Sequence, residues 1–205
     1  MRKNLFTGKF VAFEGLDGSG QTTQANLLKD FLIKKGVKVI LTKEPTLKSR
    51  AGIKIKKILA EEITVSPKEL QELFAKDRNW HQKNIIEPAL KKGKIVISDR
   101  SQFSSLAYGV ASGVELDYLL KINKKFIEPD LIILLKVSPK VCLQRIKKRG
   151  EKETLFEKEK QLNKVWQIFE KLSKKFKNII MVNGEKSIEE IHRKIKEIVS
   201  QKLEA

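Results

Sequence analysis

The stretch Gly15-Leu-Asp-Gly-Ser-Gly20-Gln-Thr22 decides the fold class of this chain. Its spacing matches the pattern Gly-x-x-x-x-Gly-Lys-Ser/Thr, in which glycines turn the backbone tightly and consecutive N–H groups face phosphate oxygens. Gln21 stands where that pattern has lysine. The stretch therefore predicts a nucleotide phosphate site and leaves open how well the site supports phosphoryl transfer.

The segments on either side of the loop favour this interpretation. Residues 10–14 are apolar up to a final glutamate, which predicts a buried strand, and residues 23–35 have apolar side chains at helical spacing. A strand, a glycine turn and a helix in this order form the frame that a phosphate loop needs, although a plain tight connection has the same order. Phosphate contacts are expected from the following loop residues: Gly15, Gly18, Ser19, Gly20, Gln21, Thr22 and Thr23.

Short apolar strands alternate with helical segments along the whole chain. Such alternation is typical of an α/β fold with three layers, here a five-stranded parallel sheet with helices on both faces. No repeat or linker divides the sequence, so residues 1–205 are interpreted as one domain. The strands are predicted at residues 10–14, 37–42, 95–98, 131–137 and 179–182.

Composition excludes several classes of protein. Cys142 is the single cysteine, and the N-terminus lacks a signal peptide, so we expect a cytoplasmic protein without disulfides. No apolar run approaches the roughly 20 residues that span a bilayer, so a membrane protein is not expected. The net charge of +18 favours polyanionic partners, but the lysines are scattered in pairs, so most should be solvated and a nucleic-acid partner is not expected.

Polar residues follow three of the predicted strands. Asp17 follows the first, Glu44-Pro45 the second and Asp99-Arg100 the third. In open parallel sheets, ligands bind beyond the carboxyl ends of the strands, so these side chains should share one site. Asp99 and the Thr22 hydroxyl are expected to hold magnesium, and the planar fork of Arg100 suits an acceptor phosphate. The alternative for Asp99 and Arg100 is a helix cap with a surface ion pair.

Seven short motifs resemble those of the thymidylate kinase family, in the family's order and across nearly the whole chain. They are Phe13-Glu-Gly-Leu-Asp-Gly-Ser-Gly20, Thr22-Thr-Gln24, Glu44-Pro45, Phe74-Ala-Lys-Asp-Arg78, Asp99-Arg100, Ser104-Ser-Leu-Ala-Tyr108 and Glu128-Pro-Asp130. The resemblance implies a P-loop nucleoside monophosphate kinase that moves the terminal phosphate of ATP to thymidine monophosphate (dTMP) with Mg²⁺. It also implies a homodimer formed by helix packing, for which we expect an apolar face around residues 101–111.

The resemblance assigns roles to residues of the acceptor site. Asp17 would accept a hydrogen bond from the 3′-hydroxyl of the sugar, and Arg100 would bind the acceptor phosphate. Phe74 would stack on the thymine ring, with Arg78 on the same helix face bonding a base carbonyl; by its position alone Phe74 also fits ordinary core. Tyr108 would pack against the 2′ position. The other expected contacts to dTMP are Glu44, Pro45, Lys56, Ser104 and Ser105.

A lid over ATP is implied for approximately residues 144–160. Arg145 and Lys152 would contact the ATP phosphates, and Arg149 is the preferred catalytic cation because Gly150 follows it and allows the helix to break into a loop. A lid of this kind closes on ATP and excludes water. The alternative for each of these cations is a solvated helix end.

Two positions depart from the family pattern. Gln21 can donate a hydrogen bond but cannot neutralise charge, and losing one preorganised cationic donor costs on the order of 3 kcal/mol of transition-state stabilisation. We hypothesise that Arg149 or Lys152 of the lid partly replaces the missing lysine. At Lys56 the family has an arginine, so the bidentate fork is lost.

These departures keep three hypotheses open. The first is an active thymidylate kinase that works by direct in-line transfer, through positioning and electrostatics. The second is a catalytically impaired homologue that binds nucleotides. The third is a kinase for another deoxynucleoside monophosphate.

Overall fold

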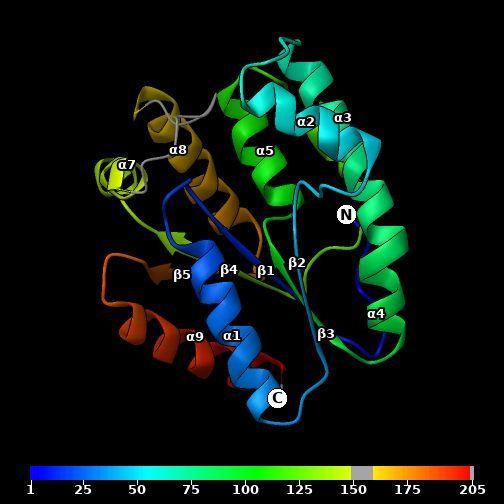
Figure 1. Ribbon diagram of the computed structural model, residues 1–205, viewed down its shortest axis with the longest axis vertical. Coiled ribbons are helices and arrows are strands. Elements are labelled where there is room, and N and C mark those ends of the chain that lie inside the picture. The colour runs from blue at the N-terminus through cyan, green and yellow to red at the C-terminus, as the bar shows by residue number, and fades with distance from the viewer. Residues whose placement is uncertain (149–158, 204–205) are drawn as a thin grey trace.

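The computed structural model describes residues 1–148 and 159–203, which form one parallel sheet of five strands with helices on both faces (Figure 1). The predicted fold class is confirmed. The strand order is β2-β3-β1-β4-β5, so the strand that enters the phosphate loop is central and β2 lies at an edge. The strands are β1 (Phe10–Gly15), β2 (Val39–Lys43), β3 (Ile95–Asp99), β4 (Leu131–Lys136) and β5 (Ile179–Asn183).

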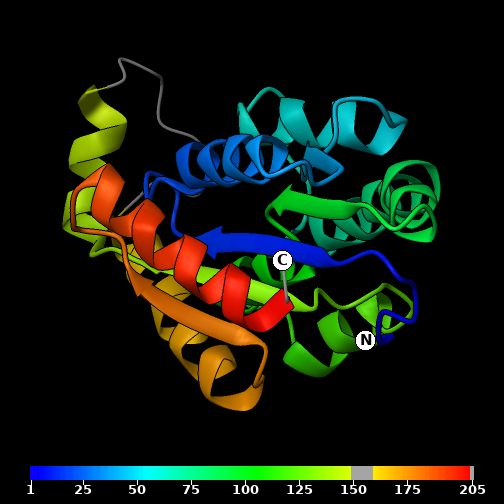
Figure 2. The same cartoon turned by 90° about the horizontal axis from the view of Figure 1, so that it is seen from below.

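The helices divide unequally between the two faces of the sheet, and Figure 2 looks onto the face that carries α1 and α9. Helices α1 and α9 pack on one face, whereas the opposite face carries the larger group that includes α3, α4, α5 and α8. The helices are α1 (Gln21–Lys34), α2 (Arg50–Leu59), α3 (Pro67–His81), the π-helical segment η1 (Gln82–Ile86), α4 (Glu87–Lys91), α5 (Gln102–Ala111), α6 (Leu116–Asn123), α7 (Pro139–Lys148), α8 (Glu159–Lys175) and α9 (Ile188–Leu203).

The central strands are continuous apolar runs because helices cover both of their faces. Every residue of β1 is buried: Val11 and Phe13 pack towards α1 and α9, and Ala12 packs towards α5 and α8. Glu14 is the exception in this apolar strand, and its side chain is fully buried. A charged group at such a position requires compensating partners nearby.

Strand register brings the predicted site residues to one edge of the sheet. Phe13 of β1 and Lys43 of β2 both align with Asp99 of β3. Beyond the strands, the Glu44 N–H donates to the Asp99 carbonyl at 3.0 Å and the Arg100 N–H donates to the Phe13 carbonyl at 3.0 Å. The phosphate loop, the loop after β2 and the loop after β3 therefore start side by side.

The expectation of a dimer surface around residues 101–111 is wrong. Most of α5 is buried inside the chain itself, where it packs against α6 and α8, because its apolar side chains complete the core above β1 and β4. The oligomeric state stays a prediction. None of the described helices is both long and apolar enough to cross a bilayer.

Candidate active site

The phosphate loop has the backbone that its glycines predict. Gly18 and Gly20 adopt φ angles of +83° and +96°, which disfavour other residues, and a Cβ on Gly18 would lie 2.6 Å from the carbonyl oxygen of Cys142 in α7. Gly20 is the N-cap of α1, so the loop ends on the positive end of a helix. The Ser19 hydroxyl is buried and has no hydrogen-bond partner among the described residues. A phosphate oxygen would satisfy it.

The side-chain amide of Gln21 lies against the backbone of the phosphate loop. Gln21 is the first residue of α1, its exposed fraction is 5%, and its Nε2 lies 3.4 Å from the carbonyl oxygen of Gly15. The amide is thus held against the base of the loop. Thr22 and Thr23 follow it in the first turn, and both are exposed.

Thr22 and Asp99 meet, as predicted for a magnesium site. The Thr22 hydroxyl donates to Oδ2 of Asp99 at 2.6 Å, beside the loop. The described residues contain no cluster of three or more His, Cys, Asp or Glu side chains suited to a metal. One hydroxyl and one carboxylate nevertheless fit Mg²⁺, which keeps several waters and takes its remaining ligands from substrate phosphates.

A cavity of about 210 Å³ opens beside this pair and collects most of the predicted acceptor residues. A larger groove of about 640 Å³ follows the edge strand β2, but none of the described residues that line it is a carboxylate, so the smaller cavity is the better active-site candidate. The residues that line the smaller cavity are Asp17, Lys43, Glu44, Pro45, Leu59, Gln71, Phe74, Arg78, Arg100, Ser101, Ser104, Ser105 and Tyr108.

Arg100 is held in one position at this cavity. Its backbone has a φ of +75°, an uncommon conformation for a residue with a side chain. Its guanidinium donates to Oδ1 of Asp17 at 2.7 Å, to Oγ of Ser104 at 2.9 Å and to the Gly15 carbonyl at 3.2 Å. Burial works to lower the pKa of Arg100, but the nearby carboxylates outweigh it and raise that pKa. The cation is therefore permanent.

Asp17 joins Arg100 to Tyr108. The Tyr108 hydroxyl donates to Oδ2 of Asp17 at 2.8 Å and accepts from the Asp17 N–H at 3.2 Å. Burial and the Asp17 charge raise the pKa of Tyr108 well above its usual value, so the phenol stays protonated. Asp17 thus presents a fixed carboxylate between the phosphate loop and the cavity.

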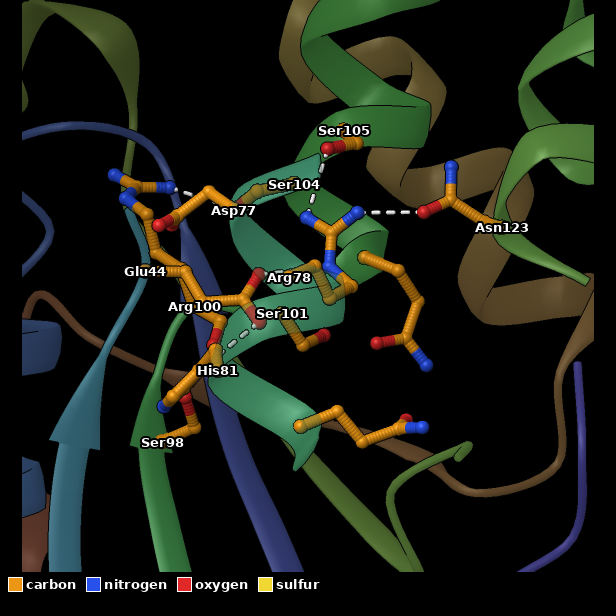
Figure 3. Close-up of polar contacts among 12 residues, drawn as sticks. Glu44, Asp77, Arg78, His81, Ser98, Arg100, Ser101, Ser104, Ser105 and Asn123 are labelled. Atoms are coloured by element: carbon orange, nitrogen blue, oxygen red, sulfur yellow. Dashed lines mark hydrogen bonds and ion pairs between the residues drawn. The ribbon is translucent and has the colours of Figure 1, made fainter. Parts of the chain in front are cut away.

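Arg78 is the centre of a buried network at the other end of the cavity. Its guanidinium donates to Glu44 Oε2 at 2.8 Å, to Ser105 Oγ at 2.9 Å and to Asn123 Oδ1 at 2.5 Å. Figure 3 shows this group between Ser105 and Asn123. His81 Nδ1 lies 3.1 Å from Glu44 Oε1. Burial works to raise the pKa of Glu44, but Arg78 and His81 hold it below its usual value.

The position of Phe74 is compatible with both roles that the sequence left open, a core residue and a residue of the acceptor site. The ring is half-buried against the core cluster of α5 and also lines the cavity, one helical turn before Arg78. Neither Asn123 nor the contact between His81 and Glu44 was predicted from the sequence. Both residues belong to the network around Arg78 through contacts between distant parts of the sequence, which no local pattern predicts.

Glu14 is a further group that the sequence analysis missed. Its Oε1 accepts from the backbone N–H and the hydroxyl of Ser101 at 2.8 and 2.7 Å, and its Oε2 accepts from the Ser104 hydroxyl at 2.5 Å. Burial raises the pKa of Glu14 to about 7, against the opposing effects of Arg100 and of these hydrogen bonds. Glu14 therefore ties the start of α5, and with it Arg100, to the central strand. A charge inside an apolar strand was the available signal.

Of the three cations predicted for the lid, the structure describes one, Arg145. Arg145 lies against the phosphate loop: its guanidinium donates to the Ser19 carbonyl at 3.3 Å and to the Gly184 carbonyl at 3.0 Å. Arg149 and Lys152 lie outside the described residues. Lys56 is exposed on α2 and is not among the residues that line the cavity, so its contact with the acceptor phosphate stays a prediction.

Lys43 is a cation that the sequence analysis overlooked. It is the last residue of β2, its Nζ lies 3.3 Å from Asp99 Oδ2, and it lines the cavity. Its position at a strand end, directly before Glu44-Pro45, was the signal that could have identified it.

Comparisons with known proteins agree with the motifs. The family model described as thymidylate kinase matches residues 13–195. A probable thymidylate kinase of Pyrococcus horikoshii is 44% identical over 202 residues, which cover 96% of this chain and 98% of the relative. A thymidylate kinase of Caldicellulosiruptor saccharolyticus is 37% identical over 203 residues, with coverage of 96% and 98%. A solved thymidylate kinase structure from Candida albicans superposes with a TM-score of 0.81 at 26% identity, covering 95% of this chain and 92% of that one.

Proposed function

We propose, because the chain belongs to the thymidylate kinase family, that it transfers the terminal phosphoryl group of ATP to dTMP and releases ADP and thymidine diphosphate. One observation carries this assignment. The phosphate loop, the Thr22–Asp99 pair and the cavity around Arg100 share one edge of the sheet. A phosphoryl donor and an acceptor bound there would be adjacent, as direct transfer requires.

The acceptor dTMP would occupy the cavity with its phosphate towards Arg100. The bidentate fork of Arg100 suits that phosphate, and the Asp17 carboxylate beside it suits the 3′-hydroxyl of the sugar. The aromatic ring of Phe74 would stack on thymine, and Arg78 would face a base carbonyl. Tyr108 would close the space beside the 2′ position. The support for these roles is that all five side chains line the same cavity.

The donor ATP would bind on the phosphate loop. The loop N–H groups suit its phosphates, as does the Ser19 hydroxyl, which has no partner within residues 1–148 and 159–203, and Arg145 lies within reach of the same loop. Thr22 and Asp99 would hold Mg²⁺, which neutralises phosphate charge when bound. We assign Arg149 and Lys152 to a lid that closes over ATP.

The reaction needs no covalent intermediate. An oxygen of the dTMP phosphate attacks the terminal phosphorus of ATP, and the bond from that phosphorus to the bridging oxygen breaks as ADP leaves. The side chains position the two phosphates in line and neutralise their charge. Arg100 is well placed to bind and neutralise the acceptor phosphate, because Asp17, Ser104 and the Gly15 carbonyl hold it at the acceptor side of the loop.

The compartment, the oligomeric state and the domain organisation are also proposals. We assign the protein to the cytoplasm as a homodimer whose single domain spans residues 1–205. Family membership supports the homodimer, and the buried thiol of Cys142 suits a reducing compartment.

The assignment is tested by ADP formation from ATP and Mg²⁺ with a panel of acceptors. The monophosphates of thymidine, deoxyuridine, deoxycytidine and deoxyguanosine are compared at equal concentrations. We expect the highest kcat/KM with dTMP. Faster turnover of another monophosphate would move the assignment to that nucleotide, and ADP formation that ignores the acceptor would contradict phosphoryl transfer to a nucleotide altogether.

A further inference from the structure

The charge that a phosphate loop normally supplies is missing at Gln21. The side chain there is a neutral amide, it is almost fully buried, and its Nε2 faces the carbonyl of Gly15. It cannot neutralise the charge that builds up on the transferring phosphoryl group. A kinase with this loop therefore needs a cation from elsewhere.

Lys43 stands beside the loop from a different strand. It ends β2, in register with Asp99 at the end of β3. Its Nζ lies 3.3 Å from Oδ2 of Asp99, the same oxygen that accepts the Thr22 hydroxyl at 2.6 Å. A single carboxylate oxygen thus separates the Lys43 ammonium from the threonine that follows Gln21.

Lys43 also belongs to the acceptor cavity, which it lines together with Asp17 and Arg100. The ammonium is consequently next to the donor loop on one side and the acceptor cavity on the other. The phosphoryl group in transit passes between these two places.

Two arginines of the described residues also lie near the loop, but their hydrogen bonds hold Arg100 on the acceptor side and Arg145 against the backbone of the loop. Arg100 is bonded to Asp17, Ser104 and a backbone carbonyl, and Arg145 is bonded to two backbone carbonyls. The Lys43 side chain is 60% exposed, and a single ion pair to the buried Asp99 is the contact that holds its ammonium in the described part of the chain. A lysine has a flexible four-carbon stem that ends in a compact charge, so its ammonium can exchange one anionic partner for another. Lys43 can therefore turn to a phosphate without breaking a buried network.

We propose that Lys43 is a catalytic residue whose ammonium contacts the terminal phosphoryl group of ATP during transfer and supplies the positive charge that Gln21 lacks. The inference rests on the proposed kinase function and adds a residue to its machinery. It replaces the need for a lid cation in that role, because Lys43 sits on a strand end that the sheet holds in place.

The first test compares kcat in a double-mutant cycle. Lys43→Met removes the charge and keeps most of the length of the side chain, and Gln21→Lys restores the usual loop. Because one preorganised donor contributes about 10²-fold or more to kcat, Lys43→Met should lower kcat by about that factor. In the Gln21→Lys background the same change should cost less than about tenfold, since two cations at one site are not additive. Lys43→Arg should retain most of the rate.

Lys48→Met is the matched control. Lys48 lies in the loop after β2, is exposed, and lines the groove along the sheet edge instead of the active-site cavity. We expect its kcat to equal that of the wild type within about twofold, because surface substitutions away from a site change little. The control separates a local charge effect from the loss of one positive charge on a protein of net charge +18.

A second test measures binding without turnover. Titration calorimetry with ATP and with ADP, in the absence of dTMP, compares wild type, Lys43→Met and Lys48→Met. If the ammonium contacts the terminal phosphate, Lys43→Met should weaken ATP binding several-fold and leave ADP binding unchanged, while Lys48→Met changes neither.

Three results would overturn the inference. They are a kcat of Lys43→Met within twofold of wild type, an equal loss with and without Gln21→Lys, and a loss confined to the KM for dTMP. These results leave the kinase function intact, because they require a wild type that turns over dTMP. A wild type that binds ATP without phosphorylating any acceptor would instead reject both proposals.

Discussion

Replacing Glu14 by glutamine should remove a pH dependence of stability that the wild type has. Glu14 is fully buried in β1, and its two oxygens accept hydrogen bonds from Ser101 and Ser104 at the start of α5. Glu14→Gln keeps the shape and most of these contacts but cannot ionise. The difference between the two proteins therefore isolates the ionisation of one carboxyl group.

The magnitude follows from the raised pKa. Burial raises the pKa of Glu14 from 4.5 to about 7 in the folded protein, so the folded state holds this proton more tightly than the unfolded state does. The resulting stabilisation is fully present below pH 4.5 and is lost as pH rises through about 7. At 1.36 kcal/mol for each pKa unit, the wild type should lose about 3 kcal/mol of unfolding free energy from this group between pH 4 and pH 8.

Urea denaturation at a series of pH values from 4 to 8 measures this loss in both proteins. Every other titrating group is common to them, so its contribution cancels in the difference. The unfolding free energy of Glu14→Gln minus that of the wild type should rise by about 3 kcal/mol across the range. A difference that stays constant would show instead that the hydrogen-bond donors and Arg100 keep Glu14 ionised across this pH range.

Three further substitutions have defined outcomes. Arg78→Met leaves Glu44 buried without its guanidinium, so denaturation should show a loss of about 3–5 kcal/mol of stability; a loss below about 1 kcal/mol would contradict the buried network. Tyr108→Phe removes the hydroxyl bonded to Asp17, so stability should fall by about 1 kcal/mol, and an unchanged unfolding midpoint would argue against that bond. Thr22→Ala should raise the Mg²⁺ concentration for half-maximal ADP formation about tenfold, whereas an unchanged Mg²⁺ titration would remove Thr22 from the metal site.

The fold was predictable because its signals are local. Each strand is a short apolar run between turn residues, and all five lie where they were predicted, with ends shifted by one or two residues. Helix α1 starts at Gln21 instead of residue 23, because Gly20 already takes the left-handed conformation of its N-cap. The backbone conformation of a glycine depends on the segments on either side of it, so the sequence alone did not determine where α1 starts.

Part of the site was predictable from the sequence, and the residues that were not predicted share one reason. Strand ends identified Asp17, Asp99 and Arg100, because parallel strands bring their carboxyl ends to one edge. Asn123 was missed because its bond to Arg78 joins positions that are 45 residues apart, and no periodic pattern encodes such a contact. The sequence also could not show that Lys56 is exposed and outside the cavity lining, because the direction of a side chain on α2 depends on how that helix packs.

Direct transfer of the phosphoryl group from ATP on the loop to dTMP in the cavity is the step on which the proposed function depends. It is tested most directly by incubating the protein with Mg²⁺, dTMP and ATP that carries ³²P in its terminal phosphate, and by separating the products. We expect label to appear in thymidine diphosphate at the same rate as ADP forms. Label that accumulates in inorganic phosphate, or that stays on the protein, at the same rate with and without dTMP would contradict it.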